Sequence, residues 1–169
     1  ERVYECRIIE QYKTMGLRNS KLSKEEKLLK AAKEGNLNVV KKMIRKGVDV
    51  NAGDVSVKLL KNSTALHYAA RKGHVDIAKV LIRNGADVKA VDGEELTVLH
   101  HVALYGRVHV MKVLIQNGAD VNAVDECKGT ALHLAARFGH IDVAKVLVQN
   151  GADVNAVNKD KKTALHFAA

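Results

Sequence analysis

A four-residue motif that recurs at one fixed interval is the strongest constraint on the fold of this chain. The motif is Thr-Ala-Leu-His or Thr-Val-Leu-His, and it begins at positions 64, 97, 130 and 163, so each copy starts 33 residues after the last. A period of this length is typical of proteins built from stacked structural repeats. Each unit of such a protein buries its apolar face only against its neighbours. Functional residues are therefore expected where the units differ.

The rest of the unit predicts two short helices and a loop. Thr64 is suited to cap the first helix, and Gly73 ends that helix because glycine readily adopts left-handed conformations. A second helix is predicted from Val75 to Ile82, and Gly85 ends it. Residues 87–93 then favour an extended turn. The predicted fold class is an all-α repeat solenoid of helix-turn-helix units joined by hairpin-like loops.

Several segments resemble the ankyrin-repeat family, and they are TALHYAA, GHVDIAKVLIRNGADV, TALHLAARFGHIDVAKVLVQNGADVNA and TALHFAA. The resemblance covers roughly residues 24–169, and it implies an ankyrin-repeat stack. Two departures stand out. The chain contains no proline, although the family usually has one after the threonine of the motif. The family's turn glycine before the motif is replaced by Glu95, Lys128 and Lys161, which puts the geometry of the loop tips in question.

The repeat pattern divides the whole chain into segments. Gly35 and Gly73 are 38 residues apart, against 33 elsewhere, so the first repeat carries a five-residue insertion after Ala52. That insertion is either a loop folded onto its own stack or a finger that contacts a partner. The expected segments are a leader at 1–22 that forms an amphipathic helix, a degenerate first repeat at 23–63, full repeats at 64–96, 97–129 and 130–162, and the truncated start of a further repeat at 163–169.

The last segment is expected to leave one end of the stack open. Leu165, Phe167, Ala168 and Ala169 are not followed by a second helix. We therefore expect the chain to be a fragment of a longer array, and to associate end to end in isolation.

Composition and charge limit which cellular compartment and which kinds of partner are expected. The net charge of +9 is uneven, because residues 1–62 hold 15 Lys and Arg against 8 Asp and Glu. Such a basic region either meets a nucleic acid, an anionic membrane or an acidic protein, or is a solvated end of the stack. Cys6 and Cys127 are predicted to be free thiols in a reducing compartment. With no apolar run long enough to span a membrane, the chain is predicted to be intracellular and cytoplasmic, with a nuclear location or delivery into a host cell left open.

No constellation for catalysis, metal binding or cofactor binding is predicted. The motif histidines His67, His100, His133 and His166 lie on successive units, too far apart to share one ion. The family resemblance implies that they hydrogen-bond the backbone and the motif threonine. His101 is different, since it replaces an apolar or aromatic core residue and is expected either to be buried neutral or to loosen its repeat.

The resemblance implies a concave binding surface made of the loop tips and the exposed face of the first helices. The predicted partner-binding residues at the helix ends are Arg71, Lys72, Leu104, Tyr105, Arg137 and Phe138. Those in the loops are Val91, Glu94, Leu96, Val124, Glu126, Cys127, Lys159 and Asp160. Tyr105 and Phe138 are the strongest candidates, because aromatic residues beside arginines are typical of interface hot spots. The alternative is that both rings only pack on neighbouring helices.

Three functions remain open at this stage. The first is a non-catalytic scaffold that binds a protein or peptide on the concave surface. The second is binding of nucleic acid or another acidic partner through the basic N-terminal part. The third is the targeting arm of a larger enzyme or effector.

Overall fold

The computed structural model describes residues 22–54 and 62–168. Its helices are α2 (Lys24–Glu34), α3 (Leu37–Arg45), α4 (Ala65–Lys72), α5 (Val75–Arg83), α6 (Val98–Leu104), α7 (Val108–Gln116), α8 (Ala131–Arg137) and α9 (Ile141–Gln149), followed by the 3-10 turn η1 (Ala164–Phe167). The predicted leader helix and Cys6 lie outside the described residues. Most of the insertion after Ala52 does as well, so both interpretations of it stay open.

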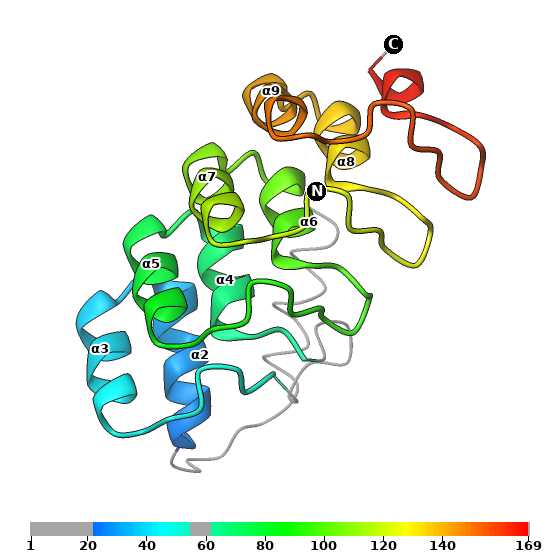
Figure 1. Ribbon diagram of the computed structural model, residues 1–169. Coiled ribbons are helices and arrows are strands. Elements are labelled where there is room, and N and C mark those ends of the chain that lie inside the picture. Colours follow the sequence, from blue (N-terminus) through cyan, green and yellow to red (C-terminus); the bar gives the residue numbers. More distant parts are fainter. Residues whose placement is uncertain (1–21, 55–61, 169) are drawn as a thin grey trace.

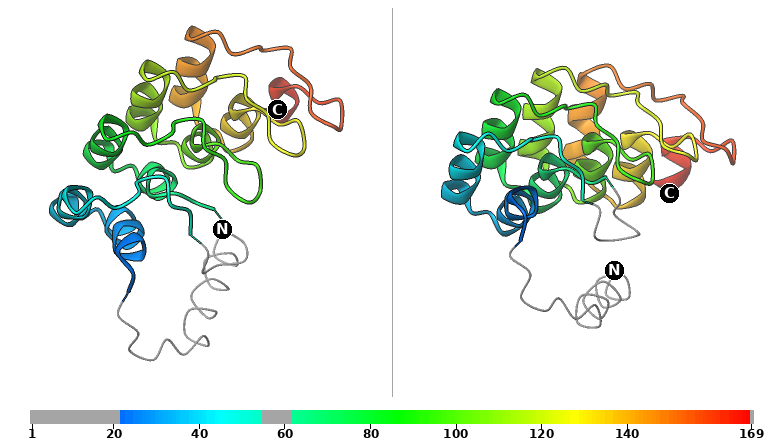
Figure 2. Two further views of the ribbon diagram at one scale, coloured as in Figure 1. Left: turned by 60° about the horizontal axis from the view of Figure 1, so that its bottom comes forward. Right: turned by 90° about the horizontal axis from the view of Figure 1, so that it is seen from below.

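The helices form two parallel rows (Figure 1). One row consists of the first helices, with α2, α4, α6, α8 and η1 in contact in that order. The second helices α3, α5, α7 and α9 form the other row. The long loops between units extend beyond the first row, away from the second, and Figure 2 shows them side by side. The all-helical repeat stack predicted from the 33-residue period is thus confirmed.

Caps at the helix starts follow from the sequence. The Ser23 hydroxyl oxygen accepts the Glu26 N–H at 3.0 Å, and the Glu26 carboxylate accepts the Ser23 N–H at 2.7 Å. This reciprocal pair satisfies two N–H groups that a helix leaves without partners. At the other end Gly35 adopts φ 78°, a left-handed conformation that stops α2.

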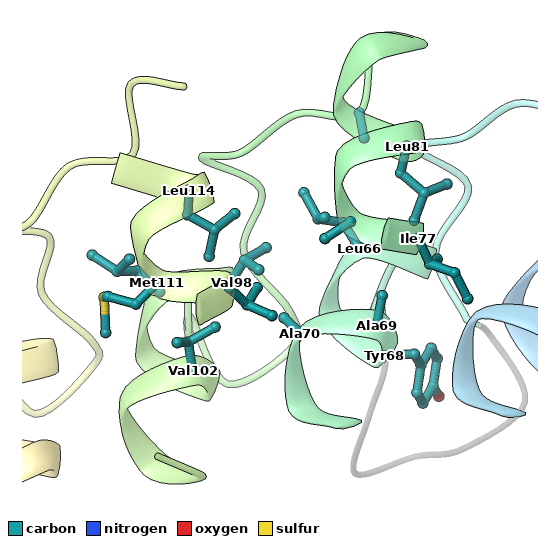
Figure 3. Packing of buried hydrophobic residues seen from close by; sticks show 14 of the residues in the cluster. Leu66, Tyr68, Ala69, Ala70, Ile77, Leu81, Val98, Val102, Met111 and Leu114 are labelled. Carbon is teal, nitrogen blue, oxygen red and sulfur yellow. The ribbon is translucent and has the colours of Figure 1, made fainter. Parts of the chain in front are cut away.

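One continuous core runs through the stack, between the two rows. Leu66 on α4 faces Ile77 and Leu81 on α5, while Ala69 and Ala70 present only methyl groups where neighbouring helices approach (Figure 3). All five side chains are at most 2% exposed. Small residues at these sites let the backbones come close, so each unit is stabilised mainly by the next.

The loop tips keep a left-handed turn without glycine. Glu95, Lys128 and Lys161 adopt φ values of 57°, 57° and 59°. An isolated antiparallel bridge, Val91 to Thr97 in one loop and Val124 to Thr130 in the next, closes each loop behind its tip. The replacement of the turn glycine therefore leaves the geometry of the tips intact.

Candidate functional site

The motif histidines are structural. The ring Nδ1 of His100 accepts the Thr97 N–H at 3.2 Å and lies 2.8 Å from the Thr97 hydroxyl. Its Nε2 lies 3.2 Å from the Gly129 carbonyl oxygen in the next loop. The same Nδ1 contacts with threonine recur in the other three copies, at His67, His133 and His166. The role that the family resemblance implied for these residues is therefore present in the structure.

His67 departs from that arrangement at its second nitrogen. Its Nε2 is buried and has no hydrogen-bond partner among the described residues. The ring instead meets His101 edge to face, with centroids 5.5 Å apart. Burial is the main reason why the pKa of His67 is lowered to about 4, and His101 lowers it further. The carboxylate of Asp92 opposes this shift, as do the nearby backbone carbonyls.

His101 forms a buried pair with Asp92. Its Nε2 lies 2.7 Å from Asp92 Oδ2, and both side chains are buried. The other oxygen, Oδ1, accepts the backbone N–H groups of Glu94 and Leu96 at 3.0 and 3.1 Å. Burial by itself raises the pKa of Asp92, but the hydrogen bond and charge of His101, together with the Glu94 and Leu96 N–H donors, leave that pKa lowered. The sequence indicated that His101 was unusual and did not reveal its partner.

Two of the predicted helix-end residues, Arg71 and Tyr105, contact each other across the boundary between two repeats. Arg71, at the end of α4, donates from Nη2 to the Tyr105 hydroxyl at 2.9 Å. Its guanidinium carbon lies 5.1 Å from the centroid of the Tyr105 ring. In the next unit Phe138 is 42% exposed, with Arg137 at 5.9 Å from its ring centroid. Phe138 is thus exposed, while the ring and the hydroxyl of Tyr105 both contact Arg71, and the roles of the two residues in binding stay predictions.

The predicted loop residues lie along the open edge of the same surface. Val91 and Val124 expose 48% and 53% of their surface. Glu94, Glu126, Cys127, Lys159 and Asp160 are also exposed, whereas Leu96 and Leu104 are half-buried. Burial and the nearby Asp92 and Glu126 carboxylates raise the pKa of Glu94. The loops are also coupled to one another, since the Lys159 N–H donates to the Cys127 carbonyl at 2.9 Å.

A further contact, at Arg107, was not predicted from the sequence. The residue before each second helix reaches back to a carbonyl of the preceding unit, and here Arg107 Nε donates to the Arg71 carbonyl oxygen at 3.0 Å. His74 and His140 use a ring nitrogen in the same place. Because Arg107 occupies the position of those histidines, comparing the aligned units is the signal that would have found it.

The second helices carry a separate basic face. Lys41, Lys79, Lys112 and Lys145 occupy equivalent, exposed positions on α3, α5, α7 and α9. None of them forms an ion pair with a carboxylate in the described part of the chain. Asp76 and Asp142 are also exposed on α5 and α9, so these lysines belong to a row of mixed charge beyond α3.

An apolar groove of about 590 Å³ lies between α8, α9 and Ala168. Its lining is mostly alanine, isoleucine and valine, with Lys145 and Gln149 as the polar side chains. Such a surface suits helix packing rather than the orientation of a small ligand. End-to-end association through it stays a prediction, which light scattering tests.

Within the residues that the structure describes, no three His, Cys, Asp or Glu side chains gather closely enough to hold a metal ion. Among the described residues, none of the helices has the length and the apolar character needed to span a membrane. Two surfaces are candidates for binding a partner. One is the concave surface made of first-helix ends and loops, and the other is the row of second helices with its four equivalent lysines.

Comparison with known proteins assigns the fold to a family. No curated protein gives a match to this chain. The family model described as ankyrin repeats, in three copies, matches residues 28–125 and again residues 99–169. Ankyrin repeats generally act as protein-interaction modules. The match takes in all the helices described above except the first four residues of α2, so the chain belongs to the ankyrin-repeat family.

Proposed function

We propose that the chain is a non-catalytic scaffold that binds a protein or peptide on its concave surface. The observation that carries this proposal is the pair of neighbouring aromatic residues at the helix ends, Tyr105 and Phe138, each with an arginine over its ring. Exposed aromatic and arginine side chains supply a large share of the binding energy in protein interfaces. The exposed Val91 and Val124 extend the same surface into the loops.

The test is the double substitution Tyr105→Ala with Phe138→Ala, measured against a partner isolated with the intact protein. We expect a loss of affinity of about thirtyfold or more, as for an interface hot spot. Ile141→Ala is the matched control, because Ile141 is 67% exposed and lies on the second-helix row. Unchanged affinity in a double variant that still melts like the wild type would remove the site from this surface.

A second candidate function is binding of nucleic acid through the basic N-terminal part. It is favoured by Lys41, Lys42, Arg45 and Lys46 at α3, which are all exposed and form no ion pair with a described carboxylate. Because binding to phosphates releases counterions, affinity should fall steeply with salt. Lys41→Gln with Lys42→Gln should then weaken retardation of duplex DNA or RNA in a gel. Absence of any retardation at low salt would eliminate this function.

A further inference from the structure

The guanidinium group of Arg71 is held in one orientation by the neighbouring unit. It donates to the Tyr105 hydroxyl at 2.9 Å, and its carbon lies 5.1 Å from the Tyr105 ring centroid. Tyr105 itself caps the end of α6, so its position is fixed by the helix. A guanidinium that is ordered in advance loses less side-chain entropy when it binds an anion.

Arg107 is fixed against the backbone of Arg71. Its Nε donates to the Arg71 carbonyl oxygen at 3.0 Å. A methyl group added at Gly73 would lie 3.1 Å from the Arg107 Cδ, so the stem of the side chain runs across that glycine. These contacts anchor Arg107 through its stem and Nε, and they leave its terminal amino groups for another ligand.

The surroundings of the two arginines favour negative charge. Burial lowers the pKa of Lys33, and the positive charges of Lys72 and Arg71 lower it further, which places these cations close together. Carboxylates compensate in part, because Asp54 and Glu34 raise the pKa of Lys33 and Arg71 acts on Glu94 without pairing with it. Within the described residues, Arg71, Lys72 and Arg107 form no ion pair.

We infer that Arg71 and Arg107, with Lys72, form an anion-binding site at the boundary between the repeats 64–96 and 97–129, and that the partner reaches it with the carboxylate of an aspartate or glutamate. This inference rests on the proposed function, because it assigns the chemistry of the partner on the concave surface. Arginine matches a carboxylate through two parallel N–H donors. The partner is thus a protein segment with an acidic side chain near an apolar one, the latter placed against Phe138.

The direct probe is labelled poly-L-glutamate, titrated into the full chain at low salt. Arg71→Gln should weaken its binding about tenfold, the loss expected when one charge-assisted hydrogen-bonding group is removed. Arg107→Gln should act in the same direction. Tyr105→Phe, which keeps the ring and removes the hydroxyl, should weaken binding about threefold. Thermal melting of each variant checks that the fold is retained.

Arg83→Gln is the matched control, since it removes the same charge from the exposed end of α5. Binding within about twofold of the wild type is expected there. Equal losses for Arg71→Gln and Arg83→Gln, or no binding of poly-L-glutamate, would overturn the inference. A phosphoserine peptide that competes far better than a glutamate peptide of equal charge would overturn the carboxylate assignment.

These outcomes are separate from those of the proposed function. If Tyr105→Ala with Phe138→Ala leaves the affinity for the isolated partner unchanged, the proposed function fails, whatever poly-L-glutamate does. If that double variant loses the partner while Arg71→Gln keeps it, the concave surface stands and the anion site is wrong.

Discussion

Two neighbouring loops of this molecule share one backbone and are attached to the stack in different ways. In the loop 91–97, Asp92 Oδ1 accepts two backbone N–H groups, and Asp125 Oδ1 does the same in the loop 124–130. Only Asp92 has a side-chain partner for its second oxygen, because His101 stands where the next unit has Leu134. The loop 91–97 is therefore tied to the helix that follows it.

The loop 124–130 is tied to α6, the first helix of the preceding unit. His100 Nε2 lies 3.2 Å from the Gly129 carbonyl oxygen. The equivalent atom of His67 makes no hydrogen bond with a described residue, although the ring is buried against His101. In the first loop the Asp92–His101 pair thus lies buried beside the His67 ring, where the next loop has the hydrogen bond between His100 and Gly129.

Removing the loop carboxylates should give the largest difference between the two loops. Asp92→Ala leaves His101 buried without its partner, which costs about 4 kcal/mol. Asp125→Ala loses the same two backbone hydrogen bonds and no buried pair, so it should cost about 2 kcal/mol. Urea unfolding followed by circular dichroism measures both. Equal costs would show that the pair contributes nothing beyond the shared backbone contacts.

Acidification should have the next largest effect, through the buried ring of His67 that packs on His101. The pKa of His67 is about 4 in the folded chain, against an ordinary value of 6.5, so the unfolded state takes up a proton first as the pH falls. Stability is complete above pH 6.5 and is lost on the way to pH 4, by about 3 kcal/mol in total. His100, whose pKa burial also lowers, adds a loss of the same sign.

The measurement is the free energy of unfolding between pH 7 and 4, beside a nuclear magnetic resonance titration of the His67 ring. His67→Gln removes the titrating group, so its stability should depend less steeply on pH. The same slope in the variant and the wild type would assign the loss to other groups.

The sequence predicts the features of the two loops and their helices that recur in every unit. The period of 33 residues places the motif threonines and histidines, and local rules for caps and glycines place the helix ends. Asp92 and His101 are nine positions apart on a loop and a helix, and no local rule indicates that these two side chains meet. The Arg71–Tyr105 contact is harder still, because it joins residues 34 positions apart in different units. Differences between the units indicated Tyr105 and Phe138 as candidates, and the sequence already placed Arg137 next to Phe138, but the contact of Tyr105 with Arg71 required three-dimensional packing.

Replacing His101 by the leucine of the next unit should lower the stability of the fold by an intermediate amount. His101→Leu copies Leu134 and leaves the Asp92 carboxylate buried with only its two amide N–H donors. We expect a loss of about 2 kcal/mol. In an Asp92→Asn background the same change should cost less, because the charge is gone. A double-mutant cycle measures this coupling, and a coupling energy of zero would show that the 2.7 Å contact does not stabilise the fold.

The smallest effect, equal in the two loops, is expected at the turn tips. Glu95 and Lys128 both adopt φ 57°, a left-handed conformation that costs a residue with a Cβ about 1–2 kcal/mol relative to glycine. Glycine at either site removes that cost, but it also raises the entropy of the unfolded chain by about 0.5–1 kcal/mol. Glu95→Gly and Lys128→Gly should therefore each stabilise the fold by about 0.5 kcal/mol. Thermal unfolding at one pH checks this. If one loop gained stability and the other lost it, the tips would not share a single geometry in solution, and the two loops would differ in backbone as well as in attachment.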